Sequence, residues 1–248
     1  MIKEPILLVT IYVLLAIIIR FWKPNLFTGA LLAIVMIASC TYIGKTKYPE
    51  VLESYHWMRG QVLAISSSGH SVYAPQVGSP YPDLELLDQN GSVTRLSDFK
   101  GKTIVIEPFG SRCPACIAFS GGHRKGGYRG MLPQRNLKSF EQYAKQYGGV
   151  DLGRDDIVFV QLFLYDHEMQ PPNLREVKRW ADHFDFKRSE YNVVLQGTAE
   201  LQTELTKSMV PGFQLIDRNF VLRADSTGHK PQHNFYTEFI LMLKDLTK

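Results

Sequence analysis

The feature that most constrains this chain is a cysteine pair, Cys113 and Cys116, placed soon after an apolar run at residues 103–107. The run has the composition of a β-strand, so the pair is expected where a strand ends and a helix begins. A thiol at a helix N-terminus faces unpaired backbone N–H groups and the positive end of the helix dipole, which favour the thiolate. The second thiol lies within reach to close a disulfide. The spacing therefore indicates thiol–disulfide exchange.

A structural zinc site is the alternative for the same spacing, because such sites also use C-x-x-C pairs. A closed zinc site needs four ligands, and the chain holds only one more cysteine, Cys40, inside an apolar segment. His229 and His233 have the spacing of a ligand pair but lie far from the cysteines in the sequence. Redox chemistry is therefore favoured over zinc, and we expect no metal and no cofactor.

Two apolar stretches, residues 6–19 and 26–43, occupy the amino terminus and are separated by a short polar turn. A membrane-spanning helix needs about 20 apolar residues, and neither stretch shows a polar face. We expect residues 1–45 to form a membrane anchor of two transmembrane helices. One anchor preceded by a signal-like segment remains the alternative.

Cys40 raises a second question about this anchor. With the small residues before it, it resembles a bacterial lipobox cysteine, although a whole apolar segment lies upstream where a short charged region is expected. We favour a cysteine buried in the membrane.

The side of the membrane is decided by chemistry rather than by charge. The flanking Lys and Arg residues differ by only one between the two sides, which leans slightly toward a cytoplasmic domain. Disulfide chemistry belongs mostly to oxidising compartments, so we expect an extracytoplasmic soluble domain, periplasmic or at the cell surface. A formal net charge of +4 over 248 residues gives little support for nucleic-acid binding.

Beyond the anchor, residues 46–77 have the composition of a stalk, and residues 78–248 show regular alternation of strand and helix patterns. This alternation predicts an α/β sandwich. Strands are expected at 84–87, 92–96, 103–107, 157–164, 191–195, 213–216 and 221–224, and helices at 173–184, 199–209 and 233–246.

Four sequence blocks together resemble thioredoxin-fold proteins of the TlpA/redoxin type. They are 78–88, then 90–91 with 96–102, then 107–116, and finally 210–213 with 215–217. The resemblance runs from Gly78 to the C-terminus. It implies a thioredoxin-like three-layer α/β sandwich and a thiol–disulfide oxidoreductase that acts on the thiols and disulfides of other proteins.

The resemblance also implies roles for individual residues. Cys113 matches the attacking cysteine and Cys116 the resolving one. Pro211 matches the family's cis-proline beside the disulfide, and Val210 the residue whose backbone pairs with an extended substrate. Glu107 stands where thioredoxins carry a buried acid, which would take the proton of the resolving cysteine. A strand-edge carboxylate in water is the alternative for Glu107.

Three features around the motif depart from the family pattern or leave a choice open. Residues 110–112 replace the usual Trp-containing stretch, and Arg112 either favours the thiolate at the substrate-binding surface or is a solvated charge. Pro114 is expected to contact substrate, and the Pro-Ala pair leaves the direction of exchange open. The glycine-rich basic segment 121–130 should break the motif helix, and is either a partner-binding loop or an inert insertion.

Two other functions compete with this one. A thiol peroxidase is disfavoured because Gly110 and Ile106 stand where the peroxiredoxin pattern requires a hydroxyl residue and a proline. A copper-delivery protein would use the two cysteines with a histidine such as His229 or His233, although copper chaperones typically space the cysteines one residue wider. Solvent-facing histidines are the simpler interpretation.

Overall fold

The computed structural model describes residues 73–248. The predicted membrane anchor at 1–45, Cys40 and most of the predicted stalk lie outside these residues. Within 73–248, none of the helices has the length and apolar character needed to cross a bilayer.

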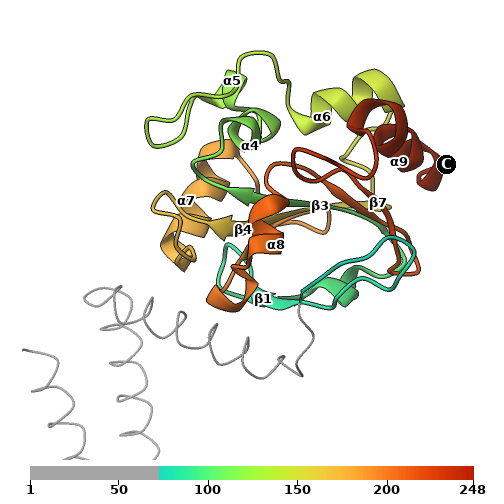
Figure 1. Cartoon of the computed structure of the whole chain (residues 1–248), viewed down its shortest axis with the longest axis horizontal. Helices are drawn as coiled ribbons and strands as arrows, with labels where there is room; N and C mark the ends of the chain where they lie inside the picture. Colours follow the sequence, from blue (N-terminus) through green and yellow to red (C-terminus); the bar gives the residue numbers. More distant parts are fainter. Residues whose placement is uncertain (1–72) are drawn as a thin grey trace, which may run out of the picture. The chain divides into compact units, whose positions relative to one another are not determined.

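A five-stranded sheet forms the centre of the described structure, with strand order β5-β4-β3-β6-β7 (Figure 1). The three strands β3, β4 and β5 run parallel, β6 runs antiparallel to β3, and β7 pairs with β6 as a hairpin. The long strands β3 and β4 are buried along their whole length, as expected for parallel strands covered on both faces. The bounds are β3 Thr103–Gly110, β4 Ile157–Tyr165, β5 Asn192–Gln196, β6 Gln214–Ile216 and β7 Leu222–Asp225.

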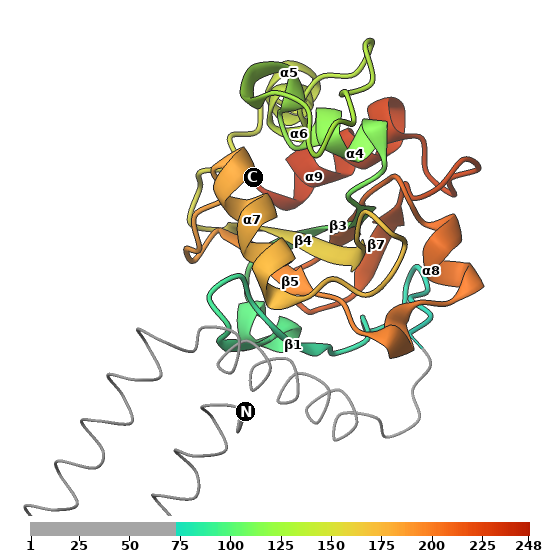
Figure 2. The same cartoon turned by 90° about the vertical axis from the view of Figure 1, so that its left-hand side faces the viewer.

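Helices cover one face of this sheet (Figures 1 and 2). The strands contribute alternate residues to the core beneath these helices, including Val105, Phe109, Phe159 and Phe163. The elements on this side are α4 Pro114–Phe119, α5 Gly122–Lys125, α6 Phe140–Tyr143 continued by the π-helical turn η2 Ala144–Gly148, α7 Leu174–Phe184, and η4 Phe235–Phe239 continued by α9 Ile240–Leu246.

The opposite face is covered by a β-hairpin and short helical turns. Its core contains the other set of strand residues, such as Ile104, Ile106 and Leu162, together with Tyr73 and Tyr81. The covering elements are β1 Glu85–Leu87, β2 Val93–Arg95 and η1 Leu96–Phe99, with η3 Ala199–Leu201 and α8 Glu204–Ser208. Sheet, helical layer and hairpin layer together give the predicted α/β sandwich.

One predicted helix is wrong, and the short helices α5 and α6 were not predicted. The helix expected over 199–209 is two pieces, because Thr203 adopts an extended conformation and caps α8 through its side chain. The capping box of Ser139 and Gln142 starts α6, and this S-x-x-Q signal is visible in the sequence. The predicted break after the motif helix is confirmed, since α4 ends at Phe119 and Gly121 has a φ of 93°.

Candidate active site

The cysteine motif lies at the junction between β3 and α4. The strand ends at Gly110, whose carbonyl accepts a hydrogen bond from the Cys113 N–H at 3.1 Å. Cys113 has extended backbone angles and is the N-cap of α4, and Pro114 is the first helical residue, a position where its missing N–H costs nothing. The Cys113 Sγ accepts a hydrogen bond from the Cys116 N–H at 3.1 Å. The strand-to-helix junction expected from the sequence is thus present.

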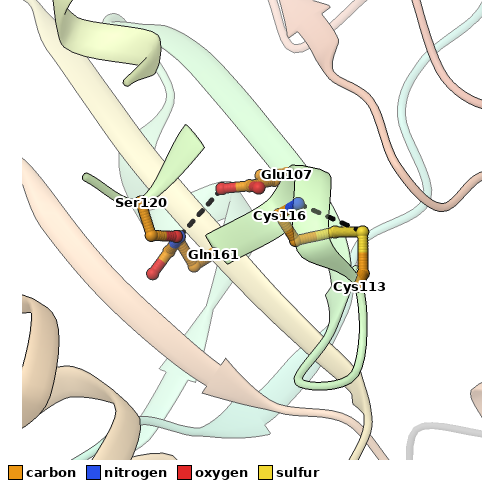
Figure 3. The surroundings of a disulfide bond; sticks show 5 residues. All are labelled: Glu107, Cys113, Cys116, Ser120 and Gln161. Carbon is orange, nitrogen blue, oxygen red and sulfur yellow. Dashed lines mark hydrogen bonds between the residues drawn. A yellow bond between two sulfur atoms is a disulfide. The ribbon is translucent and has the colours of Figure 1, made fainter. Parts of the chain in front are cut away.

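Cys113 and Cys116 are joined by a disulfide with a Cα–Cα distance of 5.2 Å (Figure 3). Cys116 is completely buried, whereas Cys113 is partly exposed and Pro114 and Arg112 are exposed. An incoming thiolate or disulfide can therefore reach Cys113 but not Cys116. This asymmetry is what a pair with one attacking and one resolving thiol requires.

Glu107 is a fully buried carboxyl group on β3. Its neighbour in the parallel pairing with β4 is Gln161, whose Nε2 donates to Glu107 Oε2 at 2.8 Å. The other oxygen, Oε1, has no hydrogen-bond partner in the described structure. Burial raises the pKa of Glu107 to about 8, because the charged form loses hydration, and the Gln161 hydrogen bond offsets only part of that effect.

Gln161 connects this carboxyl group to the motif helix (Figure 3). Its Nε2 also donates to Ser120 Oγ at 2.8 Å, and its Oε1 accepts from Trp180 Nε1 at 2.9 Å, so the amide orientation is fixed from three sides. Ser120 lies one helical turn after Cys116, whose carbonyl accepts its backbone N–H at 2.9 Å. The Glu107 carboxyl group is therefore linked to the side of α4 that carries Cys116.

Ser120, Gln161 and Trp180 were not among the predicted site residues. Gln161 is the one polar residue inside the apolar run of β4, which was a usable signal. Trp180 packs in the core against Phe109 and Phe163, with ring centroids 4.5 Å and 5.7 Å away. Its indole N–H also donates the hydrogen bond to Gln161 Oε1 that helps to orient this amide.

The loop before β6 lies at the same end of the sheet as the motif. The Val210–Pro211 peptide bond is cis. Ile106 pairs with Gln214, and continuing that antiparallel register by two residues on each strand places Gly212 opposite Pro108, near the end of β3. Val210 packs against the same apolar cluster as Cys113. Within residues 73–248 nothing donates a hydrogen bond to the Val210 carbonyl.

The remaining predicted side chains are less tightly bound to the site. Arg112 forms no hydrogen bond or ion pair with another residue of the described range. His233 Nδ1 accepts the Asp225 backbone N–H at 3.2 Å, so one ring nitrogen is already occupied. Among residues 73–248 there is no group of three or more His, Cys, Asp or Glu side chains placed to hold a metal ion.

Comparison with known proteins gives structural likeness only. No family model and no curated protein matches the sequence. Among solved structures, the thioredoxin domain of a thiol-disulfide oxidoreductase from Bacteroides vulgatus is 12% identical, covering 70% of this chain and 99% of its own, with a TM-score of 0.42. A thioredoxin-family thiol:disulfide interchange protein from Chlorobium tepidum is 15% identical over 69% and 99%, with a TM-score of 0.41.

A second Bacteroides vulgatus protein, described as a putative thiol-disulfide oxidoreductase, is 26% identical over 71% of this chain and 97% of its own, with a TM-score of 0.39. These overlays are loose, and the fold is defined instead by the strand order and by the position of the cysteine pair after β3. Residues 73–248 form a thioredoxin-like domain with a C-x-x-C disulfide at the start of the helix that follows its central strand.

Proposed function

We propose that this protein is a membrane-tethered thiol–disulfide oxidoreductase that acts on protein disulfides through Cys113 and Cys116. One observation carries the proposal: a disulfide joins a partly exposed cysteine at the start of α4 to a buried cysteine on the same helix. The exposed sulfur is available to a partner, and the buried sulfur closes the cycle without competing for substrate.

In the reductase direction, the Cys113 thiolate attacks one sulfur of the substrate disulfide. A new S–S bond joins enzyme and substrate, and the other substrate sulfur leaves as a thiolate. The Cys116 thiol then loses its proton and attacks Cys113 Sγ, which forms the Cys113–Cys116 disulfide and releases the second substrate thiolate. Two electrons pass to the substrate, and the oxidase direction reverses every step.

Glu107 is the proton acceptor in this proposal. A carboxyl group with a pKa of about 8 exchanges protons near neutral pH, which suits it to take the Cys116 proton during the attack. Gln161 holds one of its oxygens and leaves Oε1 without a partner. Arg112 and Pro114 are the exposed chain neighbours of Cys113, and Val210 packs against the same apolar cluster as Cys113. The Val210 carbonyl would pair with the backbone of an extended substrate.

The location of the protein is part of the same proposal. Residues 1–45 would hold the domain at the bilayer, on the extracytoplasmic side, where disulfide exchange between proteins is common. The direction of electron flow follows from the reduction potential of the cysteine pair, measured against glutathione and dithiothreitol buffers.

Trapping of the intermediate tests the proposal. With Cys116→Ser, the full-length protein should accumulate a mixed disulfide with a substrate protein, because the second attack is removed. The adduct should appear on a non-reducing gel and disappear with dithiothreitol. Cys113→Ser is the matched control and should form no adduct. Equal adduct formation by both variants, or by neither, would contradict the assigned order of attack.

A further inference from the structure

The stretch from the end of β3 to the start of α6 carries positive charge without any negative charge. Residues 108–140 contain six Lys and Arg residues and no Asp or Glu, while the whole chain has 28 basic and 24 acidic residues. Two of the six are neutralised within the fold, since Lys125 pairs with Asp185 and Arg129 with Glu176. Arg112, Arg124, Arg135 and Lys138 form no ion pair within the described residues.

This segment is built against the motif helix. The Gln134 backbone N–H donates to the carbonyl of Pro114 at 2.9 Å, and the Gln134 carbonyl is 3.0 Å from His123 Nε2. Gly122 is buried close to both Ile117 and Pro133. The connection between α5 and α6 therefore runs directly beside Pro114 of the C-x-x-C motif. It lies on the α4 side of the sheet (Figures 1 and 2).

The tip of the connection is also anchored. Tyr128 and Met131 form an isolated antiparallel β-bridge. Arg129 and Gly130 make the turn between them, with φ angles of 46° and 83°. The Tyr128 ring packs against Trp180 at 4.8 Å between centroids, and Met131 packs against the cluster that also contacts Cys113. An inert insertion would not require these contacts with the active-site core.

Four exposed residues lie within a few positions of these anchors in the chain, and we call them together the basic face: Arg112, Leu132, Arg135 and Lys138. All four residues are exposed, and Leu132 is 74% exposed, the highest value among the large apolar side chains of residues 73–248. Arg124 is not part of the basic face. It lines a cavity of 270 Å³ together with three acidic residues, Glu141, Asp151 and Asp185, which offset its charge. An exposed apolar side chain together with three cations that form no ion pair fits an acidic partner with an apolar residue of its own.

We infer that the basic face docks an acidic polypeptide segment next to the disulfide of the substrate protein, so that acidic protein disulfides are the preferred substrates. This inference rests on the proposed function and adds its substrate class. Complementary charge acts mainly by raising the rate of encounter, so the preference should appear in second-order rate constants and should weaken as salt screens the charges.

The test uses the pre-reduced full-length protein and two synthetic peptides. Both peptides carry the same intramolecular disulfide, flanked in one by glutamates and in the other by lysines. At low ionic strength the glutamate peptide should be reduced about ten times faster. The double variant Arg135→Glu with Lys138→Glu should abolish that ratio, and Leu132→Ser should slow the glutamate peptide without changing its salt dependence.

The matched control is Lys244→Glu with Lys248→Glu, which makes the same change in net charge at the exposed C-terminal end of the chain. It should leave the ratio unchanged. Equal rates for both peptides in the unmodified protein, or loss of the ratio in the control as well as in the basic-face variant, would overturn the docking inference alone. Absence of reaction with either peptide would overturn the proposed function too.

Discussion

Glu107 has a side chain with no exposure to solvent and only one hydrogen-bonded oxygen. Burial favours the neutral acid, and its pKa of about 8 lies well above the ordinary value of 4.5. A carboxyl group in water would be ionised at neutral pH and would have little tendency to hold a proton. Burial is therefore what makes this residue suitable as the proton acceptor for a thiol.

The same pKa predicts how stability depends on pH. Between 4.5 and about 8 the folded protein keeps a proton on Glu107 that the unfolded chain has lost. The free energy of unfolding should therefore fall as pH rises through this window, by up to about 1.4 kcal/mol per pH unit from this group. Glu107→Gln should lose this component. Urea unfolding of the oxidised protein at several pH values measures it, and equal slopes in both proteins would count against a raised pKa.

The residues that sequence reasoning found and missed differ in one physical respect. Cys113, Cys116 and Glu107 lie within ten residues of one another, so a linear motif brings them together. Gln161 is 54 positions from Glu107 and meets it only through the register of β3 with β4. Strand register depends on tertiary packing, so the sequence alone did not connect these two residues.

At the level of elements, the contact between α4 and α5 decides where the basic segment lies. Gly122 is buried there, and a Cβ atom at this position would lie 2.6 Å from Ile117 Cγ2 and 2.7 Å from the Ile117 carbonyl oxygen. The sequence predicted that glycines would end the motif helix. It did not predict that one of them permits close packing, because that depends on how the chain turns back after Gly121.

Gly122→Ala should therefore separate α5 from α4. We expect a destabilisation of about 1–3 kcal/mol, from overpacking against helix backbone, and faster protease cleavage within the segment between α5 and α6. Gly153→Ala is the control: this glycine is exposed, and its added Cβ would meet only the Asp151 side chain at 3.3 Å. Similar unfolding midpoints for the two variants would show that α4 and α5 tolerate a wider separation.

For the whole molecule, the packed structure includes Tyr73, which precedes the expected domain start at Gly78. Its hydroxyl lies 2.6 Å from that of Tyr81, and Tyr81 donates to Gln214 Oε1 at 2.6 Å. Gln214 in turn donates to Asp225 at 2.9 Å. The preceding Ser- and Gly-rich composition suggested a linker, whereas the pairing with a distant strand fixes Tyr73 in the core.

Tyr73→Phe should lower the free energy of unfolding by about 1 kcal/mol, because a buried hydroxyl pair is lost while the ring still fills its place. Tyr73→Ala should cost roughly 3–5 kcal/mol. Tyr147→Phe, at a ring that is 46% exposed, should change stability by less than about 0.5 kcal/mol. Chemical denaturation compares the three, and no loss in Tyr73→Ala would mean that the domain does not depend on this residue.

Alternate side chains of β3 point to opposite faces of the sheet, so this one strand contributes to both the active site and the hairpin layer. Glu107 and Phe109 face the helices and the cysteines, whereas Ile104 and Ile106 face the hairpin layer. Inserting or deleting a single residue early in this strand would exchange the two sets, turning the acid toward the apolar layer and an isoleucine toward the thiols. The number of residues between the start of β3 and the motif is thus fixed. A substitution alters one buried position, whereas a change of length by one would exchange the two faces and abolish chemistry and packing together.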